Sequence, residues 1–131
     1  MEAKPIQFYL IILCALLAVG LSPSGHAKKT GKKKEKHYQA EWCAGRGLTE
    51  YRLPDRTRVD CLTESHAIEF DWAKKWHEGI GQSLYYSVQT GKRAGIVLIV
   101  KRRKHYKYWI RLNTTIQHHE LPIDTWLIED Y

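Results

Sequence analysis

The chain has 131 residues, of which 44% are hydrophobic and 27% are charged, and its formal net charge is +7. A length of this size fits one small domain. A charge this positive favours polyanionic partners, namely nucleic acid, acidic lipid or acidic glycan, and does not choose among them.

The N-terminus has the layout of a secretory signal peptide. Lys4 precedes an apolar run from Ile6 to Leu21, and the small residues Gly25 and Ala27 follow it. The run of 16 residues is shorter than the roughly 20 that a membrane-spanning helix needs. We therefore predict that residues 1–27 are cut off after Ala27 and that the protein is periplasmic or secreted. An uncleaved membrane anchor is the alternative.

Residues 28–36, KKTGKKKEK, have basic and polar side chains and no apolar one. Such a segment cannot bury a core, so we predict a disordered basic linker here and a folded domain over residues 37–131. The mature chain keeps the net charge of +7, because the leader holds one basic and one acidic side chain.

Two cysteines, Cys43 and Cys61, remain after cleavage. In an oxidising compartment such a pair often forms a disulfide, and we predict one here. Two buried free thiols are the alternative, since the sequence does not show whether the two Cα atoms come within bonding range.

The hydrophobic periodicity predicts an α/β domain with a mixed β-sheet flanked by helices. Residues 94–100, AGIVLIV, form a continuous apolar run, which is typical of a strand buried on both faces. Alternation of apolar and polar residues predicts the other strands, and a helical period predicts the helices. In chain order, we expect a helix at 37–46, strands at 48–53, 57–63 and 67–72, a helix at 73–90, a strand at 94–100, a helix at 106–116 and a strand at 122–129.

Three acidic residues mark one end of the predicted sheet. Glu69 and Asp71 alternate on one strand, so both point to the same face. Asp60 lies on the preceding strand, where hairpin pairing brings it beside one of them. Carboxylates held this close repel each other unless a cation lies between them, and such hard oxygen ligands suit Mg²⁺ or Mn²⁺. The alternative is that these acids are solvated on an outer face of the sheet.

A polar stripe runs along the next predicted helix. At about 100° per residue, Lys75, Gln82 and Tyr86 lie on one narrow side of this helix. Gly79 lies on the same side and leaves room for a close neighbour, whereas Lys74 lies off the stripe. The alternative is an amphipathic helix whose polar side is incidental.

The order of these features resembles the PD-(D/E)xK nuclease superfamily. The helix segment GQSLYY resembles the Q-x-x-x-Y motif of its RecB-like and lambda-exonuclease-like branch. The resemblance covers about residues 38–129. The family core, αβββαβ, matches the predicted order of elements, with one helix and one strand added at the C-terminus.

The family motifs fall on particular residues of this chain. Asp60 matches the motif Asp and Glu69 matches the (D/E) position, while the helix motif falls on Gln82 and Tyr86. Glu50 matches the extra acidic residue that many members carry.

One departure concerns the motif Lys. The family places it two residues after the acid, where this chain has Asp71. Some members take this Lys from the following helix, and the polar stripe nominates Lys75 for that role.

The resemblance implies an exported metal-dependent nuclease that hydrolyses phosphodiester bonds. Asp60 and Glu69, helped by Asp71, are expected to hold Mg²⁺ or Mn²⁺, which lowers the pKa of a bound water. Lys75 is expected to orient or deprotonate that water, while Gln82 and Tyr86 position a phosphate or brace the site. The expected partner is nucleic acid, DNA in preference to RNA.

The displaced Lys leaves a rival function open, namely a catalytically inactive exported protein that binds nucleic acid or another polyanion on the same fold. Residues 101–109, KRRKHYKYW, alternate basic and aromatic side chains and are predicted to contact phosphates. The alternative for this segment is a solvated loop that leads into a helix with Trp109 in the core.

Overall fold

The computed structural model describes residues 33–131. The predicted signal peptide, its cleavage site and most of the predicted linker therefore lie outside the described residues. Within residues 33–131, no helix combines the length and the apolar character needed to cross a membrane.

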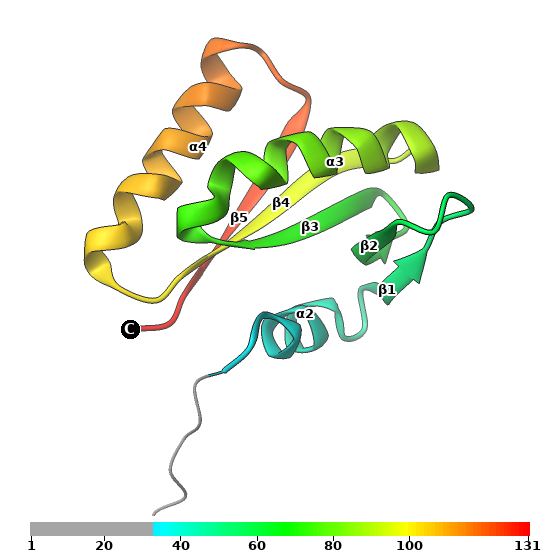
Figure 1. The fold of residues 1–131 in the computed structure, drawn as a ribbon, viewed down its shortest axis with the longest axis horizontal. Coiled ribbons are helices and arrows are strands. Elements are labelled where there is room, and N and C mark those ends of the chain that lie inside the picture. Colours follow the sequence, from blue (N-terminus) through cyan, green and yellow to red (C-terminus); the bar gives the residue numbers. More distant parts are fainter. Residues whose placement is uncertain (1–32) are drawn as a thin grey trace, which may run out of the picture. The chain divides into compact units, whose positions relative to one another are not determined.

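The described chain alternates helices and strands in the order that the sequence predicts, and Figure 1 shows their arrangement. Two short 3-10 helices, η1 and η2, precede the second and third long helices. The elements are α2 (Glu35–Cys43), β1 (Gly47–Arg52), β2 (Arg58–Thr63), β3 (His66–Trp72), η1 (Ala73–Lys75), α3 (Trp76–Thr90), β4 (Arg93–Val100), η2 (Arg103–His105), α4 (Tyr106–His118) and β5 (Ile123–Glu129).

The five strands form one mixed sheet in the order β1-β2-β3-β4-β5. Strands β1, β2 and β3 are antiparallel neighbours, whereas β4 pairs parallel with β3 and β5 pairs parallel with β4. A parallel pair needs a crossover connection, and α3 and α4 supply the two crossovers. The predicted α/β class with a mixed sheet is confirmed.

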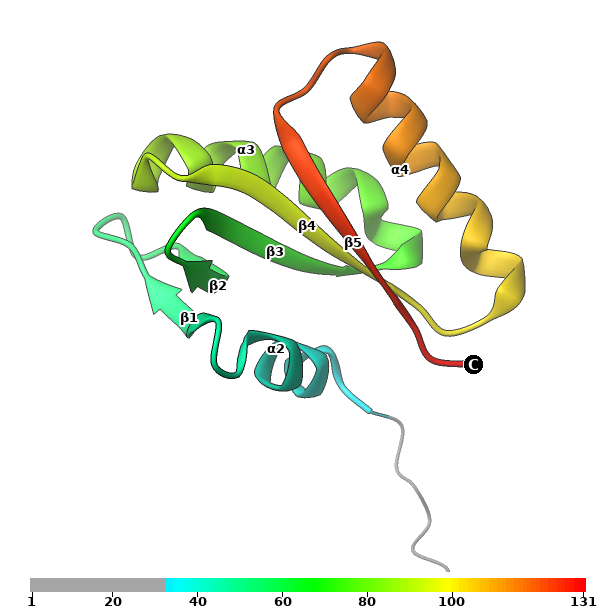
Figure 2. The ribbon, with the colours of Figure 1, turned by 180° about the vertical axis from the view of Figure 1, so that it is seen from behind.

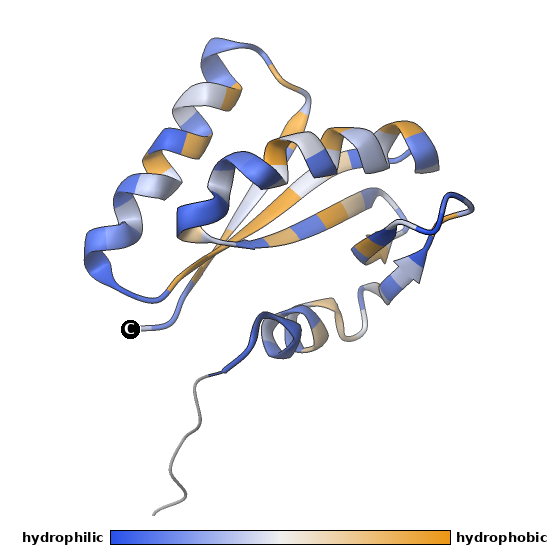
Figure 3. Ribbon diagram, viewed as in Figure 1, coloured by the Kyte–Doolittle hydropathy of each residue, from blue (hydrophilic) through white to orange (hydrophobic). Residues whose placement is uncertain are grey.

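Helices cover the two faces of the sheet, as the views in Figures 1 and 2 show. Ile96 and Leu98 of β4 pack in a core with residues of α3 and α4, whereas Val97 and Ile99 pack in a second core with residues of α2. Strand β4 is therefore buried on both faces, which explains its unbroken apolar sequence (Figure 3).

The first helix begins and ends earlier than the sequence predicts. It spans Glu35–Cys43 rather than 37–46, and Gly45, at a φ of 71°, lies in the turn that follows it. The predicted linker is therefore wrong at its last two residues, since Glu35 and Lys36 form the first turn of α2. A Glu in the first turn of a helix interacts favourably with the positive end of the helix dipole.

The predicted helix at 73–90 is two elements. Ala73–Lys75 is a 3-10 helix, and the regular α-helix begins only at Trp76. Lys75 adopts a φ of −99° and a ψ of 13°, outside the α-helical range. The assumption that Lys75 shares one regular helix with Gln82 and Tyr86 is therefore wrong.

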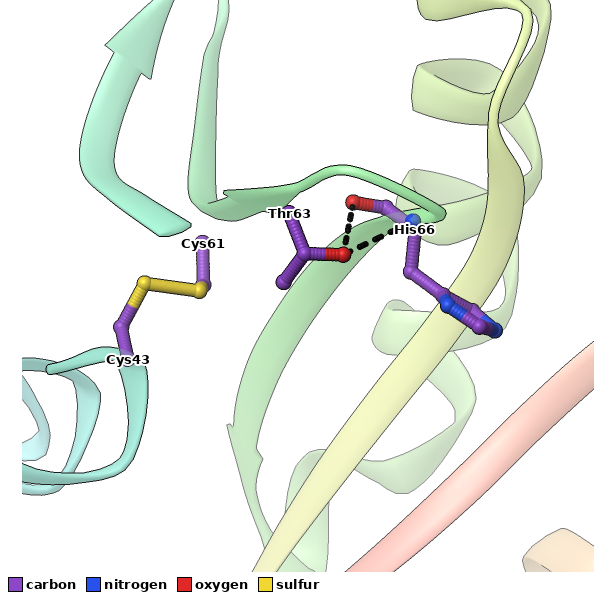
Figure 4. Close-up of a disulfide and its surroundings, with 4 residues drawn as sticks. All are labelled: Cys43, Cys61, Thr63 and His66. Carbon is purple, nitrogen blue, oxygen red and sulfur yellow. Dashed lines mark hydrogen bonds between the residues drawn. A yellow bond between two sulfur atoms is a disulfide. The ribbon is translucent and has the colours of Figure 1, made fainter. Parts of the chain in front are cut away.

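Cys43 and Cys61 form the predicted disulfide, with a Cα–Cα distance of 5.9 Å. Both residues are fully buried, and the bridge joins the last residue of α2 to the middle of β2. Figure 4 shows it near the β2–β3 turn, where the Thr63 hydroxyl accepts a hydrogen bond from the backbone amide of His66 at 2.9 Å.

Replacement of both cysteines, Cys43→Ala with Cys61→Ala, should lower the free energy of unfolding by about 3 kcal/mol. The reason is that the disulfide closes a loop in the unfolded chain and so lowers the entropy of the unfolded state. Urea unfolding followed by circular dichroism measures the difference. Dithiothreitol should destabilise the wild type and leave the double variant unchanged. Equal unfolding midpoints for the oxidised wild type and the double variant would contradict this.

Candidate functional site

The site lies where β2 separates from β3. These strands pair only at Cys61↔Ile68 and Leu62↔Ala67. One step further, the carboxylate of Asp60 takes the place of a strand partner, and its Oδ2 accepts a hydrogen bond from the backbone amide of Phe70 at 2.9 Å. The split in the sheet therefore positions Asp60 next to the segment that carries Glu69 and Asp71.

The three acids brought together here are buried. Asp60, Glu69 and Asp71 expose 8%, 6% and 5% of their surface. Such burial is rare for carboxyl groups without partners of opposite charge. The alternative that these acids are solvated on an outer face is wrong, because α3 and α2 cover the strands that carry them.

Burial, together with nearby negative charges, raises the pKa of all three groups. Burial, followed by the charges of Asp60 and Asp71, raises the pKa of Glu69 to about 9. Burial and the charge of Glu35 raise the pKa of Asp71 to about 7. Burial also raises the pKa of Asp60 to about 6, although its hydrogen bond with the Phe70 amide opposes the rise. Clusters of carboxyl groups with raised pKa values are typical of functional sites.

The same region holds buried polar atoms without partners. Among the described residues, the buried side-chain atoms with no hydrogen-bond partner are Oε2 of Glu69, Oδ2 of Asp71 and Oε1 of Gln39. Each such atom costs about 1–3 kcal/mol of stability. All three belong to residues near the split between β2 and β3.

Helix α2 contributes two polar residues that the sequence analysis missed. Gln39 is 4% exposed, and its Nε2 donates a hydrogen bond to Oε1 of Glu35 at 3.5 Å. Burial, followed by the charge of Asp60, raises the pKa of Glu35. The available signal was the spacing of four between Glu35, Gln39 and Cys43, which places them on one helix face.

Only part of the predicted stripe faces the acids from helix α3. Gly79, Ser83 and Tyr86 are its buried residues, whereas Gln82 is exposed. Burial and the charge of Glu69 raise the pKa of Tyr86, and a hydrogen bond with the Gln82 side chain opposes the rise. The structure therefore brings Tyr86 close to Glu69, with Gln82 at its solvent side.

Gly79 lets α3 approach the acids closely. A Cβ at this position would lie 2.9 Å from Oδ2 of Asp71 and 3.4 Å from Cγ2 of Ile96. A methyl group would push the Asp71 carboxylate away from the helix. The close neighbour that the sequence predicts at Gly79 is thus the carboxylate of Asp71.

Gly79→Ala should lower the free energy of unfolding by about 1–3 kcal/mol, the usual cost of an overpacked interior. Gly81→Ala is the matched control, since a Cβ at Gly81 meets nothing within 4 Å. It should raise the free energy of unfolding by about 0.5–1 kcal/mol through better helix propensity. Chemical unfolding of both variants checks this, and equal stabilisation by the two substitutions would contradict the close contact.

The two neighbouring lysines have different surroundings. The side chain of Lys75 is 54% exposed and its Nζ lies 3.0 Å from Oε2 of Glu78. Its charge still reaches the site, because it lowers the pKa values of Asp71 and Glu35 against the effect of burial. Lys74 lines a pocket on the side of η2 instead.

Glu50 is close to the acids but already paired. Its Oε2 lies 2.7 Å from Nη1 of Arg58 and 3.8 Å from Nζ of Lys36. Its negative charge raises the pKa values of Asp60 and Glu69. Glu50 is therefore neutralised by two basic partners, whereas no ion pair joins Glu35 to a basic side chain of the described residues.

A basic pocket of about 1040 Å³ opens beside the acids, at the carboxyl ends of β3 and β4. It shares Glu35 with the acidic site, and its wall includes Trp72, the residue after Asp71. Burial and the positive charges of Lys74 and Lys104 lower the pKa of His105. Its basic lining residues are Lys33, Lys34, Lys74, Lys101, Arg102 and His105.

The predicted basic segment at 101–109 divides between the pocket and the core. Lys101 and Arg102 line the pocket, and the Nζ of Lys101 lies 5.6 Å from the centre of the Trp72 ring. Trp109 packs against the core between α4 and the sheet. The position expected for Trp109 is thus observed, whereas the phosphate contacts stay a prediction.

The donor atoms at the split fit a hard divalent cation. Mg²⁺ commonly binds one or two protein carboxylates and keeps several waters. Glu69 and Asp71 each offer a buried unpartnered oxygen. In the part of the chain from Lys33 onward, no three His, Cys, Asp or Glu side chains form a ready-made metal cluster.

Comparisons of the chain with protein-family models, with curated proteins and with solved structures find no match.

Proposed function

We propose that the protein is a metal-dependent nuclease with a PD-(D/E)xK-like site. One observation carries the proposal: the buried carboxyl groups of Asp60, Glu69 and Asp71 share one split in the sheet and repel each other. A bound divalent cation removes this repulsion and gives partners to the unpaired oxygens. No feature of the hydrophobic core requires acids at these positions.

Each residue of the site has a role in this proposal. Asp60 and Glu69 hold the cation, with Asp71 as a further carboxylate. A cation held there supplies a water of lowered pKa and neutralises charge on the phosphate. Lys75 orients the water as an ammonium ion, since its hydrogen bond with Glu78 raises its pKa. Tyr86 braces Glu69.

The basic pocket gives the substrate a place next to the acids. Nucleic-acid binding depends mainly on phosphate contacts made by Lys and Arg. The pocket offers such side chains from three segments of the chain, and Trp72 adds an aromatic surface on which a base can stack. Since Glu35 lines the pocket and its charge acts on Glu69 and Asp71, a nucleic-acid strand bound in the pocket lies next to the acidic site. We propose DNA as the substrate in preference to RNA.

Export agrees with the chemistry of the domain. The buried Cys43–Cys61 disulfide is compatible with a secreted protein, because such bridges persist in oxidising compartments. We propose that the protein is periplasmic or secreted and that cleavage occurs after Ala27.

The test is a cleavage assay on protein purified from the secreted or periplasmic fraction. Single- and double-stranded DNA and RNA are incubated with Mg²⁺, with Mn²⁺ and with EDTA. We expect cleavage of DNA with either metal and none with EDTA. Protein that is inert on every substrate with both metals would refute the nuclease proposal.

One observation favours the rival function. Asp71 occupies the position at which the family carries its Lys, and Lys75 pairs with Glu78 at the surface. A protein without a working Lys retains the basic pocket and binds polyanions without cutting them. Tight, salt-sensitive DNA binding by a protein that never cleaves would support this second function.

A further inference from the structure

Gln39 carries the one unpartnered buried oxygen of the described chain that does not belong to an acid. Its side chain is 4% exposed, which is unusual for Gln. The other two such atoms belong to Glu69 and Asp71, both proposed metal ligands. An amide oxygen is an acceptor only, so it can be satisfied by a donor or by a cation.

The amide nitrogen of Gln39 faces carboxyl groups. Nε2 donates to Oε1 of Glu35 at 3.5 Å. Burial raises the pKa of Asp60, and a hydrogen bond from the Gln39 side chain opposes that rise. Because the acids occupy the nitrogen, the oxygen is the atom of the amide that remains for another partner.

The fold holds this face of α2 against the site. Glu35, Gln39 and Cys43 are spaced four residues apart and share one helix face. Cys43 is bonded to Cys61, the residue that follows Asp60. The disulfide therefore fixes Gln39, one turn away from it, beside Asp60.

We propose that Gln39 is a neutral oxygen ligand of the divalent cation, with Oε1 on the ion and Nε2 holding Glu35 in place. The inference rests on the proposed function, since it adds a ligand to the same ion. Neutral carbonyl oxygens of Asn and Gln are ordinary ligands of hard cations. An amide adds an oxygen to the site without adding to the repulsion among its acids.

Calorimetric titration of Mn²⁺ into Gln39→Met and Gln39→Glu tests this. Met keeps the length of the side chain and removes the hard oxygen, so the Mn²⁺ affinity should fall about 10-fold or more. Glu keeps an oxygen at the same place, so Gln39→Glu should bind Mn²⁺ at least as tightly as the wild type. Gln117→Met, on the exposed side of α4, is the matched control and should bind like the wild type.

The outcomes separate this inference from the proposed function. Wild-type protein that binds no Mn²⁺ refutes the metal site as a whole. Wild-type protein that binds, together with an unchanged affinity in Gln39→Met, refutes the ligand role of Gln39 alone. If Gln39→Met does not fold, a loss of Mn²⁺ binding by folded Gln39→Glu overturns the inference, because that variant retains the oxygen.

Discussion

Glu69→Gln should abolish cleavage and, in the absence of metal at pH 8, make the protein more stable than the wild type. Burial and the charges of Asp60 and Asp71 raise the pKa of Glu69 to about 9, from an ordinary value of 4.5. Between pH 4.5 and pH 9, Glu69 is protonated in the folded protein and ionised in the unfolded chain. Stability therefore falls as pH rises through this window. Gln has the same shape and cannot ionise, so it avoids the penalty.

We expect Glu69→Gln to gain at least about 1.4 kcal/mol at pH 8, the free energy of one pKa unit. The gain should shrink as pH falls and vanish near pH 4.5, where the carboxyl group is protonated in both states. Urea unfolding in EDTA from pH 5 to pH 9 measures it. Cleavage should fall about 10²-fold or more, since a metal supplies several kcal/mol of transition-state stabilisation. A variant that is less stable than the wild type throughout this range would contradict the account.

Lys75→Ala should keep Mn²⁺ binding and lose most of its cleavage activity, by about 10²–10⁴-fold in kcat, the usual contribution of a general acid or base. The reason is its position: Lys75 is exposed and paired with Glu78, yet its charge acts on Asp71 and Glu35. Single-turnover cleavage beside a calorimetric Mn²⁺ titration separates the two effects.

Lys74→Ala is the comparison for this variant. Lys74 lines the basic pocket, so its loss should raise KM for DNA and leave kcat nearly unchanged. The salt dependence of DNA binding should also weaken, because one phosphate contact is removed. A large loss of kcat in Lys74→Ala with full activity in Lys75→Ala would reverse the two roles.

Much of the fold could be predicted because it rests on local patterns. The apolar run of β4 specifies a strand buried on both faces, and the alternation in β2 and β3 places their apolar residues in the core. The spacing of Glu69 and Asp71 also placed two acids on one face. Their burial was not predictable, because it depends on α3 covering that face and on the absence of a side chain at Gly79.

The part of the site on α2, Glu35 and Gln39, could not be predicted because it depends on contacts between residues far apart in the sequence. The basic run before His37 predicts a disordered linker that includes Glu35. Helix α2 is instead held by tertiary contacts: near its start the Tyr38 hydroxyl donates a hydrogen bond to Asp130, and at its end Cys43 is bonded to Cys61. Periodicity within one segment does not reveal such contacts. It also does not separate a 3-10 turn from an α-helix, which explains the wrong placement of Lys75.

The most direct test of the central claim is a calorimetric titration of Mn²⁺ into the wild type and into Glu69→Gln at pH 8. If the buried acids form a cation site, the wild type binds Mn²⁺ in a saturable isotherm and releases protons as it does so, because Glu69 is protonated before binding. Glu69→Gln should give no saturable heat. Equal isotherms for the two proteins, or no binding by the wild type, would contradict the claim that these acids hold a metal ion.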